Sequence, residues 1–207
     1  MNFYGHLVTA SWHSESPDFA WGAMLPDFAT MAQVSLLPQT GRYSEGVIFH
    51  HLGDRVFHRL PEFREQEKWA LQFLLEAGLR KGPARAVAHV GVELILDGAL
   101  VGDSPNDKLY QDALEQAAAH PPAFNDAVAT LRFTKLITRL REIGPPIGYR
   151  DPSILARTMG KILKPRPLLR LSPEDSAILS DVMAPLHRRV WASSAGIMDA
   201  MKAALGS

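Results

Sequence analysis

Two stretches of the chain carry histidines and acids at a spacing that would gather them on one helical face. In the first, His50, Asp54 and His58 follow one another at intervals of four residues. Residues at this interval stand one turn apart on the same side of a helix. Imidazole nitrogens and carboxylate oxygens are ligands for manganese, iron and zinc, so the spacing predicts a divalent metal site.

The second stretch repeats this spacing in apolar surroundings. His89, Glu93 and Asp97 are again four residues apart, and the residues between them are almost all Val, Leu and Ile. Burying an imidazole or a carboxylate in such company is costly unless it is hydrogen-bonded or binds a metal. We therefore expect two facing helices to hold one or two ions of manganese, iron or zinc in a single centre. Some of the acids could instead orient the histidines from outside the ligand shell.

The remaining histidines lack such partners. His51 follows His50 but lies about 100° round the helix, which favours a structural or outer-shell role. His13, His120 and His187 have no acids at the same spacing. We expect these three at ordinary surface or capping positions.

Proline and glycine divide the chain into segments of helical length, and period-2 strand patterns are absent. The expected fold is all-α: a single-domain helical bundle of about seven helices over residues 1–207. Residues 84–101 are apolar nearly all round and predict a buried central helix. Ser172, Pro173 and Asp175 form a helix start signal. The expected helices are 43–59, 62–80, 84–101, 105–119, 123–143, 153–163 and 173–205, after short helices and loops interrupted by prolines over 1–40.

Composition excludes several classes of function. Lys and Arg number 22, as do Asp and Glu, so a net charge of zero gives no overall attraction to nucleic acid or to an anionic membrane. There are no cysteines, which excludes disulfides, thiolate metal sites and a cysteine nucleophile. Neither a signal peptide nor a run of 18 apolar residues is present, so we expect a cytoplasmic protein.

Several motifs follow one another along nearly the whole chain: Asn2-Phe3-Tyr4-Gly5-His6-Leu7, Gly22 to Phe28, Gly46 to Asp54, Leu60-Pro61-Glu62, and Ile154 to Leu169 with its Lys164-Pro165-Arg166-Pro167 turn. These motifs, in the same order, resemble the acyl carrier protein phosphodiesterases. That resemblance implies an all-helical, HD-like hydrolase fold and a divalent metal, manganese above all. It also implies hydrolysis of the phosphodiester that links 4′-phosphopantetheine to the serine of holo acyl carrier protein. By position, His6, Asp27, His50 and Asp54 would be the metal and catalytic set.

The chain departs from the family pattern at two places. The family has an acid where this chain has His58. Its central Asp-x-x-x-Asp-His motif aligns with His89, Glu93 and Leu94, so one imidazole is lost and two are gained. With this redistribution of ligands, the protein could hydrolyse the parent substrate or another phosphoester. Alternatively, it could be a non-hydrolytic metal protein with a redox, ligand-binding or storage role. A structural relative that has lost its metal is the third alternative.

The sequence thus predicts a metal-dependent phosphoester hydrolase. Asp27 or Asp54 would orient the attacking water, and Arg55 or Arg59 would neutralise the phosphate. A basic cluster near the C-terminal end of one helix could dock an acidic acyl carrier protein, or could simply be a solvated helix end. The expected metal ligands are His6, Asp27, His50, Asp54, His58, His89 and Glu93, and the basic cluster is Arg157, Lys161, Lys164, Arg166 and Arg170.

Overall fold

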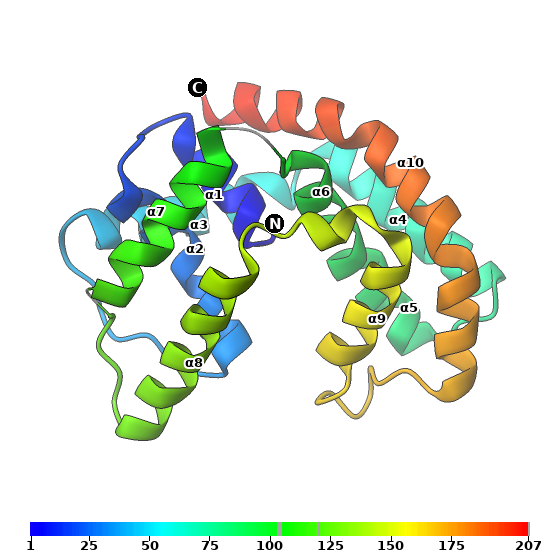
Figure 1. Cartoon of the computed structure of the whole chain (residues 1–207). Helices are drawn as coiled ribbons and strands as arrows, with labels where there is room; N and C mark the ends of the chain where they lie inside the picture. The colour runs from blue at the N-terminus through cyan, green and yellow to red at the C-terminus, as the bar shows by residue number, and fades with distance from the viewer. Residues whose placement is uncertain (103–104, 120, 207) are drawn as a thin grey trace. The chain divides into compact units, whose positions relative to one another are not determined.

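The computed structural model describes residues 1–102, 105–119 and 121–206, and these residues contain helices and no strands (Figure 1). The predicted all-α fold class is confirmed, while its HD-like identity stays a prediction. No helix in the described ranges combines the length and apolar character needed to cross a membrane. The α-helices are α1 (Phe3–Ser11), α2 (Pro17–Ala32), α3 (Gly41–Phe57), α4 (Pro61–Glu76), α5 (Lys81–Ala86), α6 (Val92–Leu100), α7 (Pro105–Ala119), α8 (Ala127–Ile143), α9 (Pro152–Leu163) and α10 (Pro173–Leu205).

The contacts within the chain define two compact units. Unit 1 takes in residues 1–56 and 100–146, with the end of α10 from Leu205. Unit 2 takes in residues 57–99 and 147–204. That residues 1–207 form a single domain stays a prediction.

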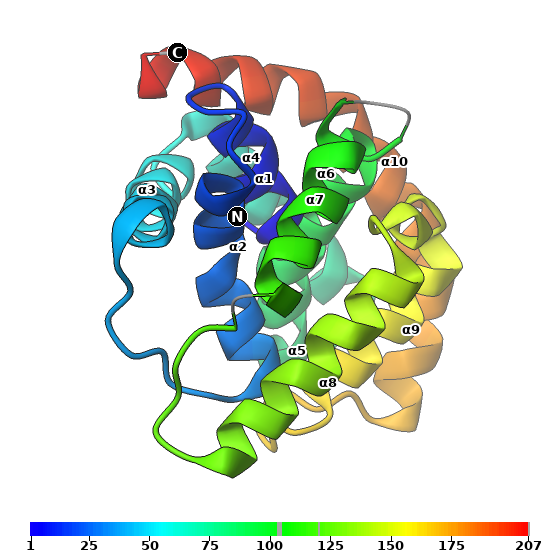
Figure 2. The same ribbon diagram turned by 60° about the vertical axis from the view of Figure 1, so that its left-hand side comes forward.

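Aromatic side chains form the core of unit 1. Helix α2 packs against α1, α7 and α8, and α1 also contacts α7 (Figure 2). Trp21 and Phe28, two turns apart on α2, have ring centroids 5.5 Å apart, and Trp21 meets the edge of Phe133 from α8 at 6.0 Å. Every residue of α1 from Phe3 to Ala10 is buried, including His6. Burial on all sides holds the backbone of α1, and with it His6, in one place.

Two glycines let α2 and α3 approach until their backbones touch. A Cβ added at Gly22 would lie 2.3 Å from the carbonyl oxygen of Tyr43. One added at Gly46 would lie 2.3 Å from the carbonyl oxygen of Phe19 and 2.7 Å from the amide nitrogen of Ala23. Neither distance is possible between real atoms, so only glycine fits at this crossing. The crossing sets the position of His50, one turn after Gly46 on α3.

Unit 2 is built around the predicted central segment. Residues 91–98 are buried without a break, whereas Arg85 is exposed and His89 and Val90 are half-buried, so the expectation of a helix buried nearly all round is confirmed for the second half of the predicted segment. The segment is interrupted, however, by a π-helical stretch, η1 (Val87–Gly91), between α5 and α6. Helix α4 contacts α5 and η1, and α9 contacts η1 and the short 3₁₀ helix η2 (Ile147–Arg150).

The helices within the described ranges outnumber the seven expected, since residues 1–40 contain α1 and α2 and the predicted helix 84–101 is divided into α5 and α6. Three local signals act differently from the prediction. Pro26 lies inside α2 instead of interrupting it, since the surrounding helix is buried and its packing offsets the missing amide hydrogen bond. Gly78, with φ of 99°, ends α4 before the predicted residue 80. The π-helical stretch divides the segment that was predicted as one helix.

The start of α10 is the capping box that the sequence predicts. The amide of Asp175 donates to Ser172 Oγ at 3.0 Å, and Asp175 Oδ2 accepts from the Ser172 amide at 2.8 Å. The same carboxylate accepts from Arg80 Nε at 2.9 Å and from Arg80 Nη2 at 2.6 Å. Burial would raise the pKa of Asp175, but the hydrogen bonds from Arg80 and Ser172 outweigh it and lower the pKa to about 2.

We expect Asp175→Asn to lower the free energy of unfolding at neutral pH by about 2 kcal/mol, since a depressed carboxyl pKa favours the folded state. The sign follows from the folded pKa lying below the unfolded one. The stabilisation is complete above pH about 4 and is lost as the pH falls through about 2. Chemical unfolding of both proteins at several pH values measures the difference. Asp181→Asn, an exposed change on α10, is the control. Equal stability of Asp175→Asn and the parent at neutral pH would contradict the prediction.

Candidate metal centres

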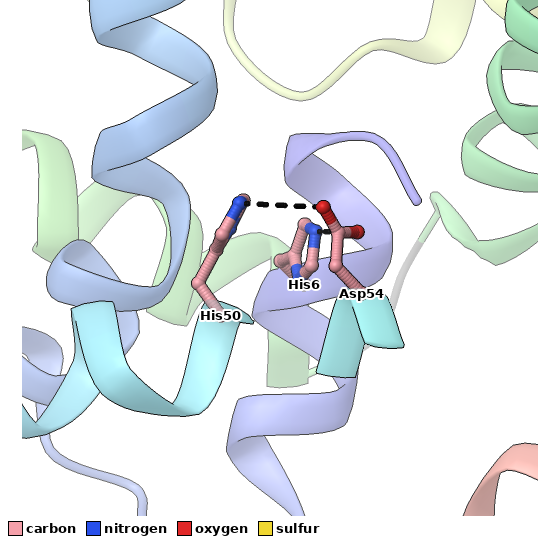
Figure 3. Close-up of side chains that lie close together, drawn as sticks. All are labelled: His6, His50 and Asp54. Carbon is pink, nitrogen blue, oxygen red and sulfur yellow. Dashed lines mark hydrogen bonds and ion pairs between the residues drawn. The ribbon is translucent and has the colours of Figure 1, made fainter. Parts of the chain in front are cut away.

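Three predicted ligands from two helices of unit 1 converge: His6, His50 and Asp54 (Figure 3). Their ligand atoms lie within 4.8 Å of one another. His6 Nε2 is 3.1 Å from Asp54 Oδ1, and His50 Nε2 is 3.7 Å from Asp54 Oδ2. The two imidazole rings stack with centroids 3.8 Å apart. Helix α1 supplies His6, and one face of α3 supplies the other two at the predicted four-residue interval.

The orientation of His50 is fixed by a backbone contact from α2. Its Nδ1–H donates to the carbonyl oxygen of Ala23 at 2.8 Å, so Nε2 carries the lone pair and faces Asp54. Burial, followed by the neighbouring His6, lowers the pKa of His50 to about 3. The ring is therefore neutral at physiological pH, which is the form that binds a metal.

Asp54 is held in the ionised form. Burial would raise its pKa, but the hydrogen bond from His6 and the α-amino group of Met1, whose nitrogen is 2.9 Å from Oδ1, lower the pKa well below its usual range. The carboxylate remains about one-third exposed, whereas His6 and His50 are buried. Solvent therefore reaches the group at its carboxylate.

A second group of predicted ligands converges in unit 2: His58, His89 and Glu93. Glu93 Oε1 lies 3.8 Å from His58 Nε2 and 3.5 Å from His89 Nε2. The prediction that His58 shares a helical face with His50 and Asp54 is wrong, because α3 ends at Phe57. Leu60 precedes Pro61, the first residue of α4, and a residue before proline is disfavoured in the helical conformation.

The structure thus gathers six of the seven predicted ligands into two groups of three. Asp27, the seventh, belongs to neither group. It is partly buried on α2, one turn after Ala23. Arg55 and Arg59, the predicted phosphate partners, are both exposed. Their predicted roles, and that of Asp27, stay predictions.

Other polar residues singled out in the sequence have different surroundings. Asp97 is buried and belongs to neither group. The pKa of Tyr149 is raised, first by the burial of Tyr149 and second by the charge of Asp97. His13 and His51 are exposed. His187 is not a surface residue: it is buried, its Nε2 bonds the Tyr149 carbonyl at 3.2 Å, and burial lowers its pKa. His120 lies outside the described residues.

Two orienting groups were not found in the sequence. They are the carbonyl of Ala23, which bonds His50, and the carboxylate of Glu67, whose Oε1 is 2.7 Å from His89 Nδ1. Both contacts join residues more than twenty positions apart, and no local pattern marks such pairs.

Each group offers two imidazoles, one carboxylate and no sulfur, a donor set that fits zinc, iron or manganese. Both groups can therefore hold a metal ion, in agreement with the prediction of a metal cofactor. The identity and number of the ions stay predictions. Comparisons with models of known families, with curated proteins and with solved structures find no match to this chain.

Proposed function

We propose that unit 1 binds a divalent metal through His6, His50 and Asp54, and that the protein is a phosphoester hydrolase. The convergence of these three residues carries the proposal. They are three of the four residues that the resemblance to acyl carrier protein phosphodiesterases assigns to the metal and catalytic set. A divalent ion held there would activate water and polarise a phosphoryl oxygen.

The chain's own residues divide the remaining work. The strongly lowered pKa of Asp54 keeps its carboxylate ionised, so Asp54 is better suited to bind the metal than to accept a proton from water. Asp27 is then the better choice to orient the attacking water. It stands one turn from Ala23 on α2, on the side that meets His50. Arg55 follows Asp54, is exposed, and would pair with the substrate phosphate.

The substrate that the resemblance favours is holo acyl carrier protein. The basic residues Arg157, Lys161 and Lys164 are exposed along and just after α9, where an acidic partner can reach them. The same exposure also fits a solvated helix end. A small phosphodiester therefore belongs in the test beside the protein substrate.

The test is hydrolysis by metal-loaded protein. Protein stripped with chelator and reloaded with manganese, zinc or iron is incubated with holo acyl carrier protein and with bis(p-nitrophenyl) phosphate. We expect one metal to restore release of phosphopantetheine or of nitrophenol, and the stripped protein to be inactive. Failure of every loaded form on both substrates would overturn the proposal.

One observation favours a second function. Two histidines with one carboxylate form the ligand set of non-haem iron(II) oxygenases as well as that of zinc hydrolases. A non-hydrolytic iron protein would retain iron through purification and show no phosphoester cleavage. Elemental analysis of protein purified without chelator, run beside the hydrolysis assay, separates the two functions.

A further inference from the structure

The group in unit 2 has the features of a metal site in its own right. In a tetrahedral zinc site with ligands at about 2.0–2.1 Å, the donor atoms lie about 3.3 Å apart. The observed separations from Glu93 Oε1 are 3.5 Å to His89 Nε2 and 3.8 Å to His58 Nε2. The ligand atoms of His58 and His89 lie within 4.8 Å of each other, so movements of up to about 1.5 Å would bring the three donors to the distances that zinc needs.

A second carboxylate orients one of the imidazoles. Glu67 Oε1 lies 2.7 Å from His89 Nδ1, so this nitrogen carries the proton and Nε2 is left to face Glu93. A carboxylate, a histidine and a metal in line are the usual arrangement around zinc-bound imidazole. Glu67 is therefore placed as a positioning residue outside the ligand set.

The surrounding backbone and rings hold the two imidazoles together. His89 lies within η1, and single π-helical turns occur frequently at functional sites. The rings of His58 and His89 are nearly parallel, with centroids 5.0 Å apart. The buried ring of Phe63 packs edge-on against both, at 5.4 and 5.8 Å. One apolar side chain thus fixes the spacing of two potential ligands.

Exposure distinguishes this group from that of unit 1. The side chains of His58 and His89 are 35% and 40% exposed, whereas Glu93 is 11% exposed. An ion can therefore reach the imidazoles from solvent. Three protein donors also leave one position of a four-coordinate zinc ion for water or an external ligand.

We propose that His58, His89 and Glu93 form a separate zinc-class metal site in unit 2, with Glu67 as its positioning carboxylate. The site would take an ion that prefers imidazole, zinc above manganese. It draws on no residue of the unit 1 group, so it stands or falls independently of the proposed hydrolase function.

The test is metal stoichiometry in paired variants. Stripped protein is titrated with Zn²⁺ against a chromophoric chelator, and bound zinc is counted by elemental analysis. We expect two equivalents in the parent and one in each of two double variants, His58→Ala/His89→Ala and His6→Ala/His50→Ala. Retention of the parent stoichiometry by His58→Ala/His89→Ala would overturn the site in unit 2, whatever the unit 1 variant does.

A finer variant tests the positioning role. Glu67→Gln should weaken zinc binding at this site by about 10–100-fold without abolishing it, as removal of an outer carboxylate does elsewhere. Glu62→Gln, an exposed change on the same helix, should leave the affinity unchanged. Equal affinities for Glu67→Gln and Glu62→Gln would remove Glu67 from the proposal.

A measurement on the unmodified protein covers the case in which the double variant fails to fold. Diethyl pyrocarbonate modifies accessible neutral imidazoles, and peptide mass spectrometry identifies each modified position. Zinc should protect His58 and His89, while exposed His13 reacts equally with and without zinc. Unchanged modification of both His58 and His89 after zinc is added would overturn the proposal.

Discussion

Replacing His50 by alanine should lower the metal affinity of the unit 1 group by at least about 100-fold. Loss of an outer-shell partner alone costs about 10–100-fold, and His50 offers the ligand nitrogen itself. Because Nδ1 is bound to the Ala23 carbonyl, Nε2 is already aimed at Asp54. Under the proposed function, hydrolysis should fall to that of the stripped protein at any metal concentration that leaves the site empty.

The measurement is metal affinity by competition titration, followed by hydrolysis of bis(p-nitrophenyl) phosphate. His13→Ala is the control, because it also removes an imidazole from unit 1 but an exposed one. His50 is buried, so circular dichroism must show that the variant is folded. Asp54→Asn, at a residue one-third exposed, removes a charge without leaving a cavity and should also reduce affinity. If both His50→Ala and Asp54→Asn bound metal as tightly as the parent, the proposal that His6, His50 and Asp54 bind a metal would be wrong.

Local signals in the sequence predicted most of the helices. The starts of α7 and α10 follow from prolines at the first helical position, Pro105 and Pro173, whereas α9 begins at Pro152, one residue before its predicted start. The capping pair Ser172 and Asp175 could be recognised because its members are three residues apart. Its third partner, Arg80, could not, since it lies 95 positions from Asp175 along the chain.

Tertiary contacts account for what the sequence did not reveal. The i, i+4 pairs His50 with Asp54 and His89 with Glu93 are local, and both are present. His6 joins Asp54 across 48 positions, so only the resemblance pointed to it. Asp97 lies on α6 one turn after Glu93 but belongs to neither group, and the spacing alone does not show which residues of a triplet converge. Because α3 ends before His58, this residue joins His89 and Glu93.

The expected effect of Gly46→Ala depends on the balance of two opposing terms. Alanine is favoured over glycine in a helix by about 1 kcal/mol. At Gly46 its Cβ would lie 2.3 Å from the Phe19 carbonyl oxygen and 2.7 Å from the Ala23 amide nitrogen. Both are backbone atoms of α2, so a side-chain rotation cannot relieve the overlap. Overpacking a core costs about 1–3 kcal/mol, and the backbone overlap places Gly46→Ala at the upper end of that range, so we expect a net loss of about 2 kcal/mol.

The same substitution should weaken the metal site without touching a ligand. Pushing α3 away from α2 lengthens the 2.8 Å bond from His50 to the Ala23 carbonyl and releases the ring from its orientation. Metal affinity at the unit 1 group should fall together with stability, whereas the group in unit 2 keeps its ion. Chemical unfolding and zinc titration measure the two effects separately.

Gly160→Ala is the matched control, because a Cβ added at that position of α9 would meet no described atom within 4 Å beyond the adjoining residues and backbone of its own helix. Without a clash only the propensity term remains, so this variant should equal the parent or exceed it by up to about 1 kcal/mol. If Gly46→Ala were as stable as Gly160→Ala, α2 and α3 could not cross as closely as described. The hydrogen bond that aims His50 would then lose its structural basis, since it depends on that crossing.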